Sequence, residues 1–154
     1  MTQLQAIRKF ADFAAGTHVI IIREENWAMS LADAKPRLCL PYDLTQNDED
    51  DKLFRLDFVA RCPLARGFSN VTLSILHEIG HHFNRESYIT TDSEQYDASV
   101  GYWHFMLPCE MDATDWAIEW LQDPVHRRVA KQFERDFFGI ARSEERRVGK
   151  ECRS

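Results

Sequence analysis

The spacing of apolar residues predicts a chain that is mainly helical and contains a few short strands. Leu4, Ile7 and Phe10 fall on one face of a first helix. Gly16 is a suitable end for that helix, because glycine adopts left-handed backbone angles without strain. The same approach assigns three further segments, which are strands over residues 17–23 and 37–40 and a weak helical pattern over residues 26–34.

Alternation with a period of two returns in the middle of the chain. Phe54, Leu56 and Phe58 alternate with charged residues, which predicts a strand over residues 54–60. The polar and acidic stretch before this strand, residues 47–51, predicts a solvated loop.

Two helices are predicted in the region that follows. The apolar and β-branched run that begins at Val71 is typical of a buried helix, and Ser69 or Asn70 supplies its N-cap. A second helix is predicted from Cys109 to Gln122, directly after Pro108.

The last predicted helix begins with Asp123 as its N-cap and Pro124 at the first helical position. Its apolar residues recur every four positions as far as Gly139, which indicates an amphipathic closing helix. Residues 143–154 lack any apolar period, so we expect a poorly packed, appended tail. Residues 1–142 are predicted to form a single domain.

The composition is that of an ordinary globular protein, with 154 residues, 44% hydrophobic and 29% charged, and a formal net charge of −6. The negative charge argues against a nucleic-acid or anionic-membrane surface. The four cysteines, at positions 39, 62, 109 and 152, form no CxxC pair, which favours reduced thiols in a cytoplasmic protein. No apolar stretch has the length of a signal-peptide core or a membrane span.

Candidate chemistry lies in the buried helix, where residues 77–81 read HEIGH and match the HExxH motif. Residues four apart lie on the same face of a helix, so His77 and His81 can bind one metal ion. Glu78 lies beside this face, from which its carboxylate can take a proton from a bound water. Gly80 would let another segment approach closely. Two ordinary helix-face histidines are the alternative.

A catalytic zinc site of this type needs a third protein ligand and one open position. Glu110 is the best candidate, because Ala113 and Ala117 extend its helix face with small side chains that permit close packing against the first helix. The alternative for Glu110 is a favourable acidic residue in a first helical turn. Other candidates after the motif are Glu86, Asp92, Glu94, Asp97, His104, Asp112 and Asp115.

The two helices together resemble the ImmA/IrrE type of metallopeptidase. That family combines an HExxH helix with a later helix of the form ExxAxxFAxxLL, to which residues 110–121 (EMDATDWAIEWL) are similar. The resemblance covers about residues 71–121. It implies a small zincin-like domain whose zinc ligands match His77, His81 and Glu110, with Glu78 matching the catalytic glutamate.

The same resemblance implies a substrate, because such proteins act on DNA-binding repressors. In zincins, a sheet edge flanks the metal cleft and holds the substrate backbone, so the predicted strand 54–60 is a candidate edge. A central strand without substrate contact is the alternative. Asp112 and Asp115 are either partners that orient the ligand histidines or solvated charges. Four side chains could stabilise the oxyanion of the reaction: Tyr88, Tyr96, Tyr102 and His104.

The sequence therefore predicts an α+β fold, mainly helical, with a short sheet flanking the metal-binding helix. We expect a zinc-dependent endopeptidase with a protein or peptide partner, without direct nucleic-acid binding and without a membrane. A non-catalytic metal-containing module that sequesters a regulator is the alternative. An amidase would keep the same ligands and change only the scissile bond.

Overall fold

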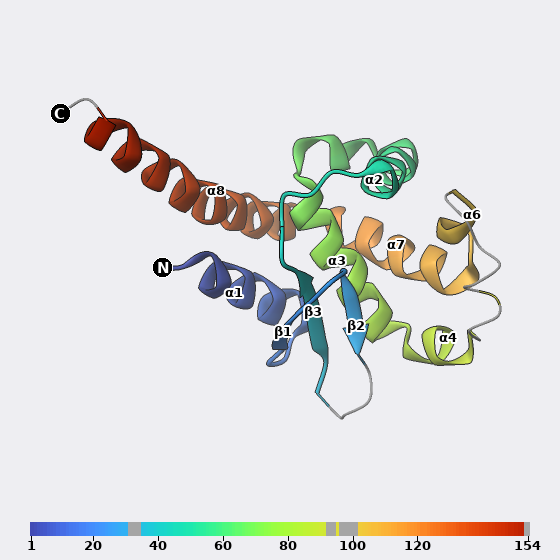
Figure 1. Cartoon of the computed structure of the whole chain (residues 1–154). Coiled ribbons are helices and arrows are strands. Elements are labelled where there is room, and N and C mark those ends of the chain that lie inside the picture. Colours follow the sequence, from blue (N-terminus) through green and yellow to red (C-terminus); the bar gives the residue numbers. More distant parts are fainter. Residues whose placement is uncertain (31–34, 92–94, 96–101, 153–154) are drawn as a thin grey trace.

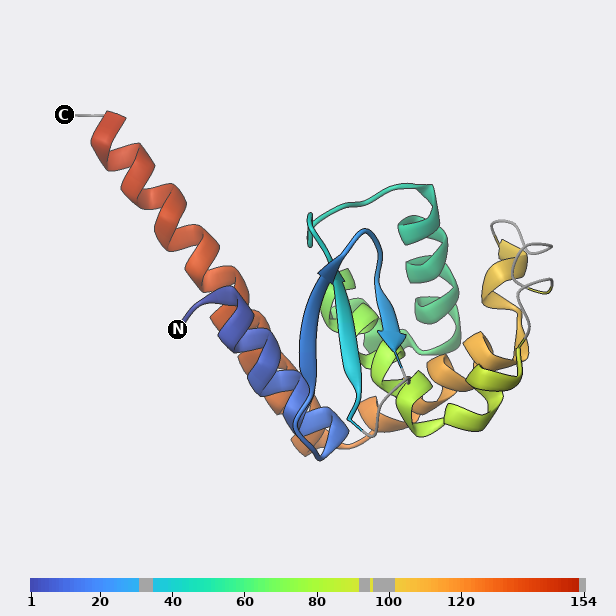
Figure 2. The ribbon, with the colours of Figure 1, turned by 60° about the horizontal axis from the view of Figure 1, so that its bottom comes forward.

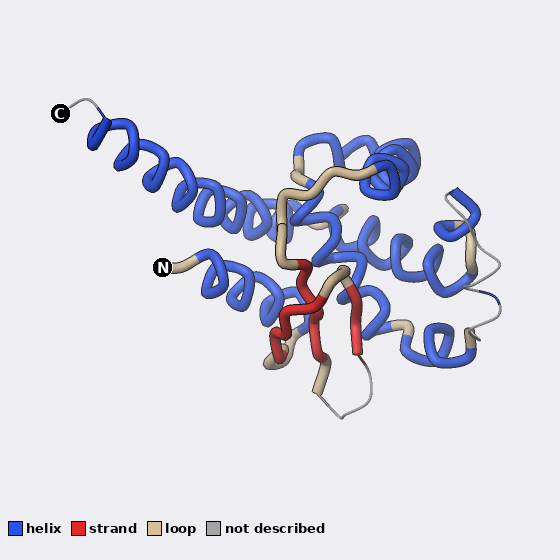
Figure 3. Tube along the Cα trace, in the orientation of Figure 1, coloured by secondary structure: helices blue, strands red, loops and turns tan. Residues whose placement is uncertain are grey.

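The structure, a computed structural model, describes residues 1–30, 35–91, 95 and 102–152, with side chains for all of these except 102–103 and 140–152. It confirms an α+β fold that is mostly helical and contains a small three-stranded sheet (Figure 3). The helix α3 (Asn70–Phe83) runs through the middle of the fold, and α7 (Pro108–Leu121) lies beside it (Figure 1).

The first helix, α1 (Gln3–Ala15), confirms the expected N-terminal helix. Thr2 and Gln5 form a capping box at its start, in which each side chain accepts a hydrogen bond from the other residue's backbone N–H. Gly16 ends the helix with a φ of 68°, in the left-handed region that favours glycine.

The sheet consists of β1 (Ile20–Glu24), β2 (Ala28–Ser30) and β3 (Arg37–Pro41). Strand β3 lies in the middle, parallel to β1 and antiparallel to β2. Strands β1 and β3 confirm the two predicted strands. The helix predicted over 26–34 is wrong, because β2 lies within it: Met29 is buried between two half-buried neighbours, which is a strand pattern. Residues 31–34 are outside the described part.

The strand predicted over 54–60 is also wrong, because these residues belong to α2 (Glu49–Arg61). Asp48 and Asp51 form a capping box, so the acidic stretch expected to be a loop begins the helix, where negative charge is favourable. Phe58 is buried, whereas Leu56 is 68% exposed, so the two do not share a sheet face. Phe54 instead contacts Phe58 one turn later, with ring centroids 5.8 Å apart.

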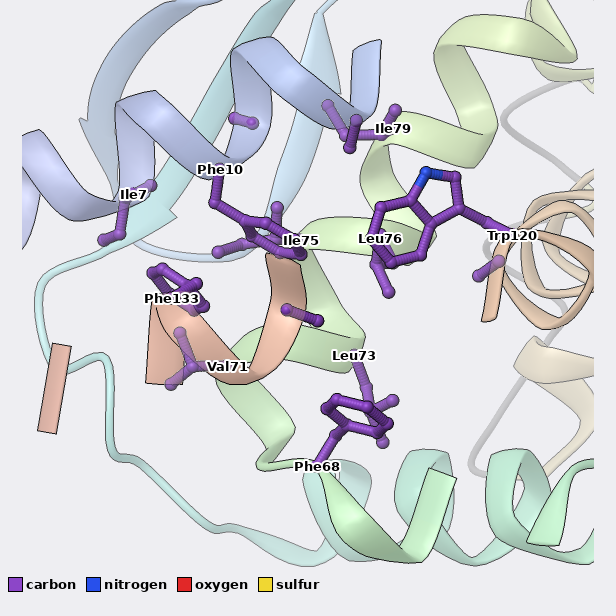
Figure 4. Close-up of a cluster of buried hydrophobic side chains, with 14 of the residues drawn as sticks. Ile7, Phe10, Phe68, Val71, Leu73, Ile75, Leu76, Ile79, Trp120 and Phe133 are labelled. Carbon is purple, nitrogen blue, oxygen red and sulfur yellow. The ribbon is translucent and has the colours of Figure 1, made fainter. Parts of the chain in front are cut away.

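Helix α3 is the centre of the core, since every side chain from Val71 to His81 is buried. Figure 4 shows its apolar side chains meeting those of α1, α7 and α8, including Phe10, Trp120 and Phe133. Among the described residues, three short helices connect the larger elements, namely η1 (Pro63–Gly67), α4 (Arg85–Thr90) and α6 (Tyr102–Phe105).

The closing helix, α8 (Pro124–Cys152), continues well past Gly139, where the sequence predicted its end. Phe133 and Phe137 are buried on its face toward α1, and Figure 2 shows the later turns extending beyond α1. Glu134 joins α8 to the start of α3, because its carboxylate accepts hydrogen bonds from Ser69 N–H and the Thr72 hydroxyl. Within the described residues, no helix combines the length and apolar character needed to cross a membrane.

Candidate metal centre

Close packing of α3 against α7 brings the predicted site together. A Cβ atom added at Gly80 would lie 2.9 Å from the Cα and carbonyl carbon of Ala113, and closer still to its carbonyl oxygen. Only a residue without a side chain therefore fits at this crossing. The helix that carries Glu110 is thus held directly against the helix that carries His77 and His81.

The two motif histidines face the same carboxylate oxygen. Oε2 of Glu110 lies 2.6 Å from Nε2 of His77 and 3.2 Å from Nε2 of His81. All three side chains are buried. The structure thus brings together two side chains of α3 and one side chain of α7. Glu110 lies 33 residues after His77 and 29 residues after His81 in the sequence.

Glu78 lies next to this cluster. Ligand atoms of His77, Glu78 and His81 all lie within 4.8 Å of one another, so the group could hold a metal ion. Burial raises the pKa of the Glu78 carboxyl to about 7; the nearby His81 lowers the pKa and Glu110 raises it. A buried carboxyl of this kind suits an acid–base role near neutral pH.

Glu110 has the opposite electrostatic character. Burial alone raises the pKa of the Glu110 carboxyl, but its hydrogen bonds and electrostatic interactions with His77 and His81 hold that pKa well below its ordinary value. Its carboxylate is therefore ionised throughout the physiological range, as a metal ligand must be.

These residues could hold a metal ion, and their donor atoms are of the kind that zinc binds. Zinc bonds of about 2.0–2.2 Å require donor atoms within about 4 Å of one another, and the Nε2–Oε2 distances of 2.6 and 3.2 Å lie below this limit. Two imidazoles and one carboxylate are also the donor set that zinc uses in hydrolytic sites. Both Glu78 and Glu110 lie close enough to be a third donor. Glu110 is the better candidate, because its Oε2 lies within 3.2 Å of both Nε2 atoms, whereas Glu78 is one residue from His77 and off the common helix face.

The second ring nitrogen of His77, Nδ1, has a partner that the sequence did not predict. Its Nδ1 atom lies 2.9 Å from the hydroxyl of Thr114, and both side chains are buried. Asp115, one of the two predicted partners, instead pairs with Arg61 and is exposed, which agrees with the alternative of a surface charge. Thr114 lies four residues after Glu110 on the same face of α7, a spacing that points to His77 only once the position of α7 beside α3 is known.

A cavity of about 570 Å³ opens onto the cluster. Phe54 of α2 contributes to its wall and contacts the ring of His77 at a centroid distance of 5.3 Å. The sequence missed this role because it placed Phe54 on a strand. The other wall residues include Asn26, Trp27, Ala28, Asp50, Asp51 and Phe105.

Two of the four candidate oxyanion donors line this cavity. Tyr88 packs against His81 with ring centroids 4.3 Å apart, and Nε2 of His104 lies 3.6 Å from Oε1 of Glu110. Burial and the nearby carboxylates of Glu78 and Glu110 raise the pKa of Tyr88 to about 12, so its phenol keeps its proton. Tyr96 and the side chain of Tyr102 lie outside the described residues.

Of the remaining candidates for a third ligand, Glu86 and Asp112 do not line the cavity. Glu86 is exposed on α4, and Asp112 is half-buried on α7. Asp92, Glu94 and Asp97 lie outside the described residues.

The raised pKa of Glu78 predicts a pH-dependent cost in the metal-free protein. Between pH 4.5 and about 7 the folded protein keeps a proton on Glu78 that the unfolded chain has lost, so the free energy of unfolding falls as pH rises. Glu78→Gln removes this titration. From pH 5 to pH 8, we expect the free energy of unfolding of the variant to rise by roughly 2–3 kcal/mol relative to that of the wild type. Urea unfolding with a chelator present measures this difference. If the free energies of unfolding of the variant and the wild type differ by the same amount at pH 5 and pH 8, the pKa of Glu78 is not raised.

Comparison of the chain with protein-family models, with curated proteins and with solved structures gave no match.

Proposed function

We propose that this protein is a zinc-dependent endopeptidase. The observation that carries the proposal is the position of one Glu110 carboxylate oxygen within 2.6 and 3.2 Å of the Nε2 atoms of His77 and His81. Glu78 lies beside these atoms, on the wall of the same cavity. A purely structural metal site has no need of a buried carboxyl next to an open cavity.

His77, His81 and Glu110 would hold the zinc ion. When bound, zinc supplies a Lewis acid that polarises a carbonyl and lowers the pKa of water. Glu78 is the general base: it takes a proton from the water that attacks the peptide carbonyl and passes it to the leaving amine. Its raised pKa suits both halves of this transfer.

A donor to the developing oxyanion completes the site. Tyr88 and His104 both line the cavity, and the phenol of Tyr88 is protonated at neutral pH. Kinetics of Tyr88→Phe and His104→Asn would separate them, because loss of the donor lowers kcat with little change in KM.

The substrate backbone is proposed to lie along β2. This strand is at the edge of the sheet, and Asn26, Trp27 and Ala28 line the cavity. An extended peptide could add to such an edge through main-chain hydrogen bonds. In this proposal the substrate-binding edge is β2 rather than residues 54–60, because those residues belong to α2.

The ImmA/IrrE resemblance supports a DNA-binding repressor as the substrate. The test is to measure zinc in the purified protein and then to incubate it with candidate repressors, with and without a chelator. We expect one equivalent of zinc and cleavage that the chelator abolishes and added zinc restores. Bound zinc with no cleavage, but with stable repressor binding, would favour the sequestering module instead.

A further inference from the structure

We propose that Thr114 is a positioning residue that orients His77 for metal binding. This inference rests on the proposed metal site and adds a residue to it. The evidence is the 2.9 Å contact between the Thr114 hydroxyl and Nδ1 of His77, made between two buried side chains.

The chemistry of a histidine ligand explains why this contact matters. A metal at Nε2 uses the lone pair of that nitrogen, so the proton of the neutral ring must be on Nδ1. A buried N–H needs an acceptor, and the hydroxyl oxygen of Thr114 can accept it. Because Thr114 is only 4% exposed, water cannot easily replace the hydroxyl. Outer partners of this kind fix the ring orientation and the protonated nitrogen.

Helix α7 supplies this partner together with a ligand. Glu110 and Thr114 are one helical turn apart, so a single face of α7 presents a carboxylate to Nε2 and a hydroxyl to Nδ1 of the same ring. The His77 ring is therefore held at both nitrogens by one helix. The close contact between Gly80 and Ala113 sets the distance between α3 and α7, and therefore the distance from Glu110 and Thr114 to the His77 ring.

The second ligand histidine is held differently. Nδ1 of His81 is buried and has no hydrogen-bond partner among the described residues. Its ring packs against Tyr88 instead. Removal of the Thr114 hydroxyl should consequently affect one ligand only, which makes the proposal testable at a single ring.

Thr114→Val tests the proposal, because valine keeps the β-branched shape and removes only the hydroxyl. We expect zinc affinity, measured by competition with a chromophoric chelator, to fall about 10–100-fold, as is typical when an outer partner of a ligand is lost. Thr114→Ser restores the hydroxyl and should return the affinity to near the wild-type value.

Thr72→Val is the matched control. Thr72 is also a buried threonine with a bonded hydroxyl, but its partner is Glu134, not a ligand histidine. We expect this variant to keep the zinc affinity of the wild type. An equal loss in both valine variants would show that Thr114 acts only through general packing, and would overturn the proposal.

Nitrogen NMR of the histidine rings gives a readout that does not require metal. In the metal-free protein, Thr114→Val should shift the Nδ1 resonance of His77 and leave that of His81 in place. Unchanged His77 resonances together with unchanged zinc affinity would refute the positioning role. A wild-type protein that binds no zinc would refute the proposed function instead, while the NMR comparison would still decide whether Thr114 holds His77.

Discussion

Glu78→Gln is expected to keep bound zinc and to lose peptide cleavage by about 10²–10⁴-fold in kcat, the range that a positioned general base contributes. Glutamine has nearly the same shape as glutamate but cannot accept the proton of the attacking water. The metal should remain, because His77, His81 and Glu110 are the assigned ligands. Zinc content and cleavage rate are measured on the same preparation.

Glu110→Gln is the control that separates the two carboxyl groups. Since Glu110 Oε2 lies within 3.2 Å of both imidazoles, this variant should lose zinc affinity by more than the 10–100-fold that loss of an outer partner costs. Loss of zinc from Glu78→Gln but not from Glu110→Gln would reverse the roles of the two residues. Full cleavage by Glu78→Gln would refute the proposed mechanism.

The parts of this site that were predictable from sequence follow from helix geometry. The positions of His77, Glu78 and His81 within one turn are set by a local rule. Glu110 was selected among distant candidates because Ala113 and Ala117 indicated that a second helix could pack closely. Gly80 of α3 and Ala113 of α7 are indeed in close contact.

The errors came from α2 and β2. In α2, an apparent period of two outweighed the capping box of Asp48 and Asp51, although Phe54 and Phe58 also have helical spacing. Strand β2 has only three residues, and its pairing with β3 decides its conformation. The cavity wall depends on these two elements, so the sequence located the proposed metal ligands and two further cavity residues, Tyr88 and His104, but not the wall contributed by Phe54 and by the residues at β2.

Thr114 was missed for a different reason. A buried threonine on a helix is common, and no local pattern shows that its hydroxyl faces an imidazole on another helix. The spacing from Glu110 becomes informative only when the relative position of α3 and α7 is known.

The relative position of α3 and α7 depends on Gly80. Among the variants proposed, Gly80→Ala is expected to have the largest effect on stability. The added methyl group would overlap the backbone of Ala113, which cannot move aside as a flexible side chain can. Alanine should otherwise favour the helix by up to about 1 kcal/mol. We nevertheless expect a loss of about 3 kcal/mol or more in the free energy of unfolding, at or above the upper end of the range for overpacking.

Gly139→Ala provides the matched comparison, because Gly139 also lies in a helix and an added Cβ there meets nothing within 4 Å among the described residues. This variant should be as stable as the wild type or slightly more stable. If Gly80→Ala folds, displacement of α7 should move Glu110 and Thr114 away from His77 together, so zinc affinity must fall as well. A Gly80→Ala protein with unchanged stability and zinc affinity would show that α7 does not pack at this distance, and the ligand set assigned to the site would then be wrong.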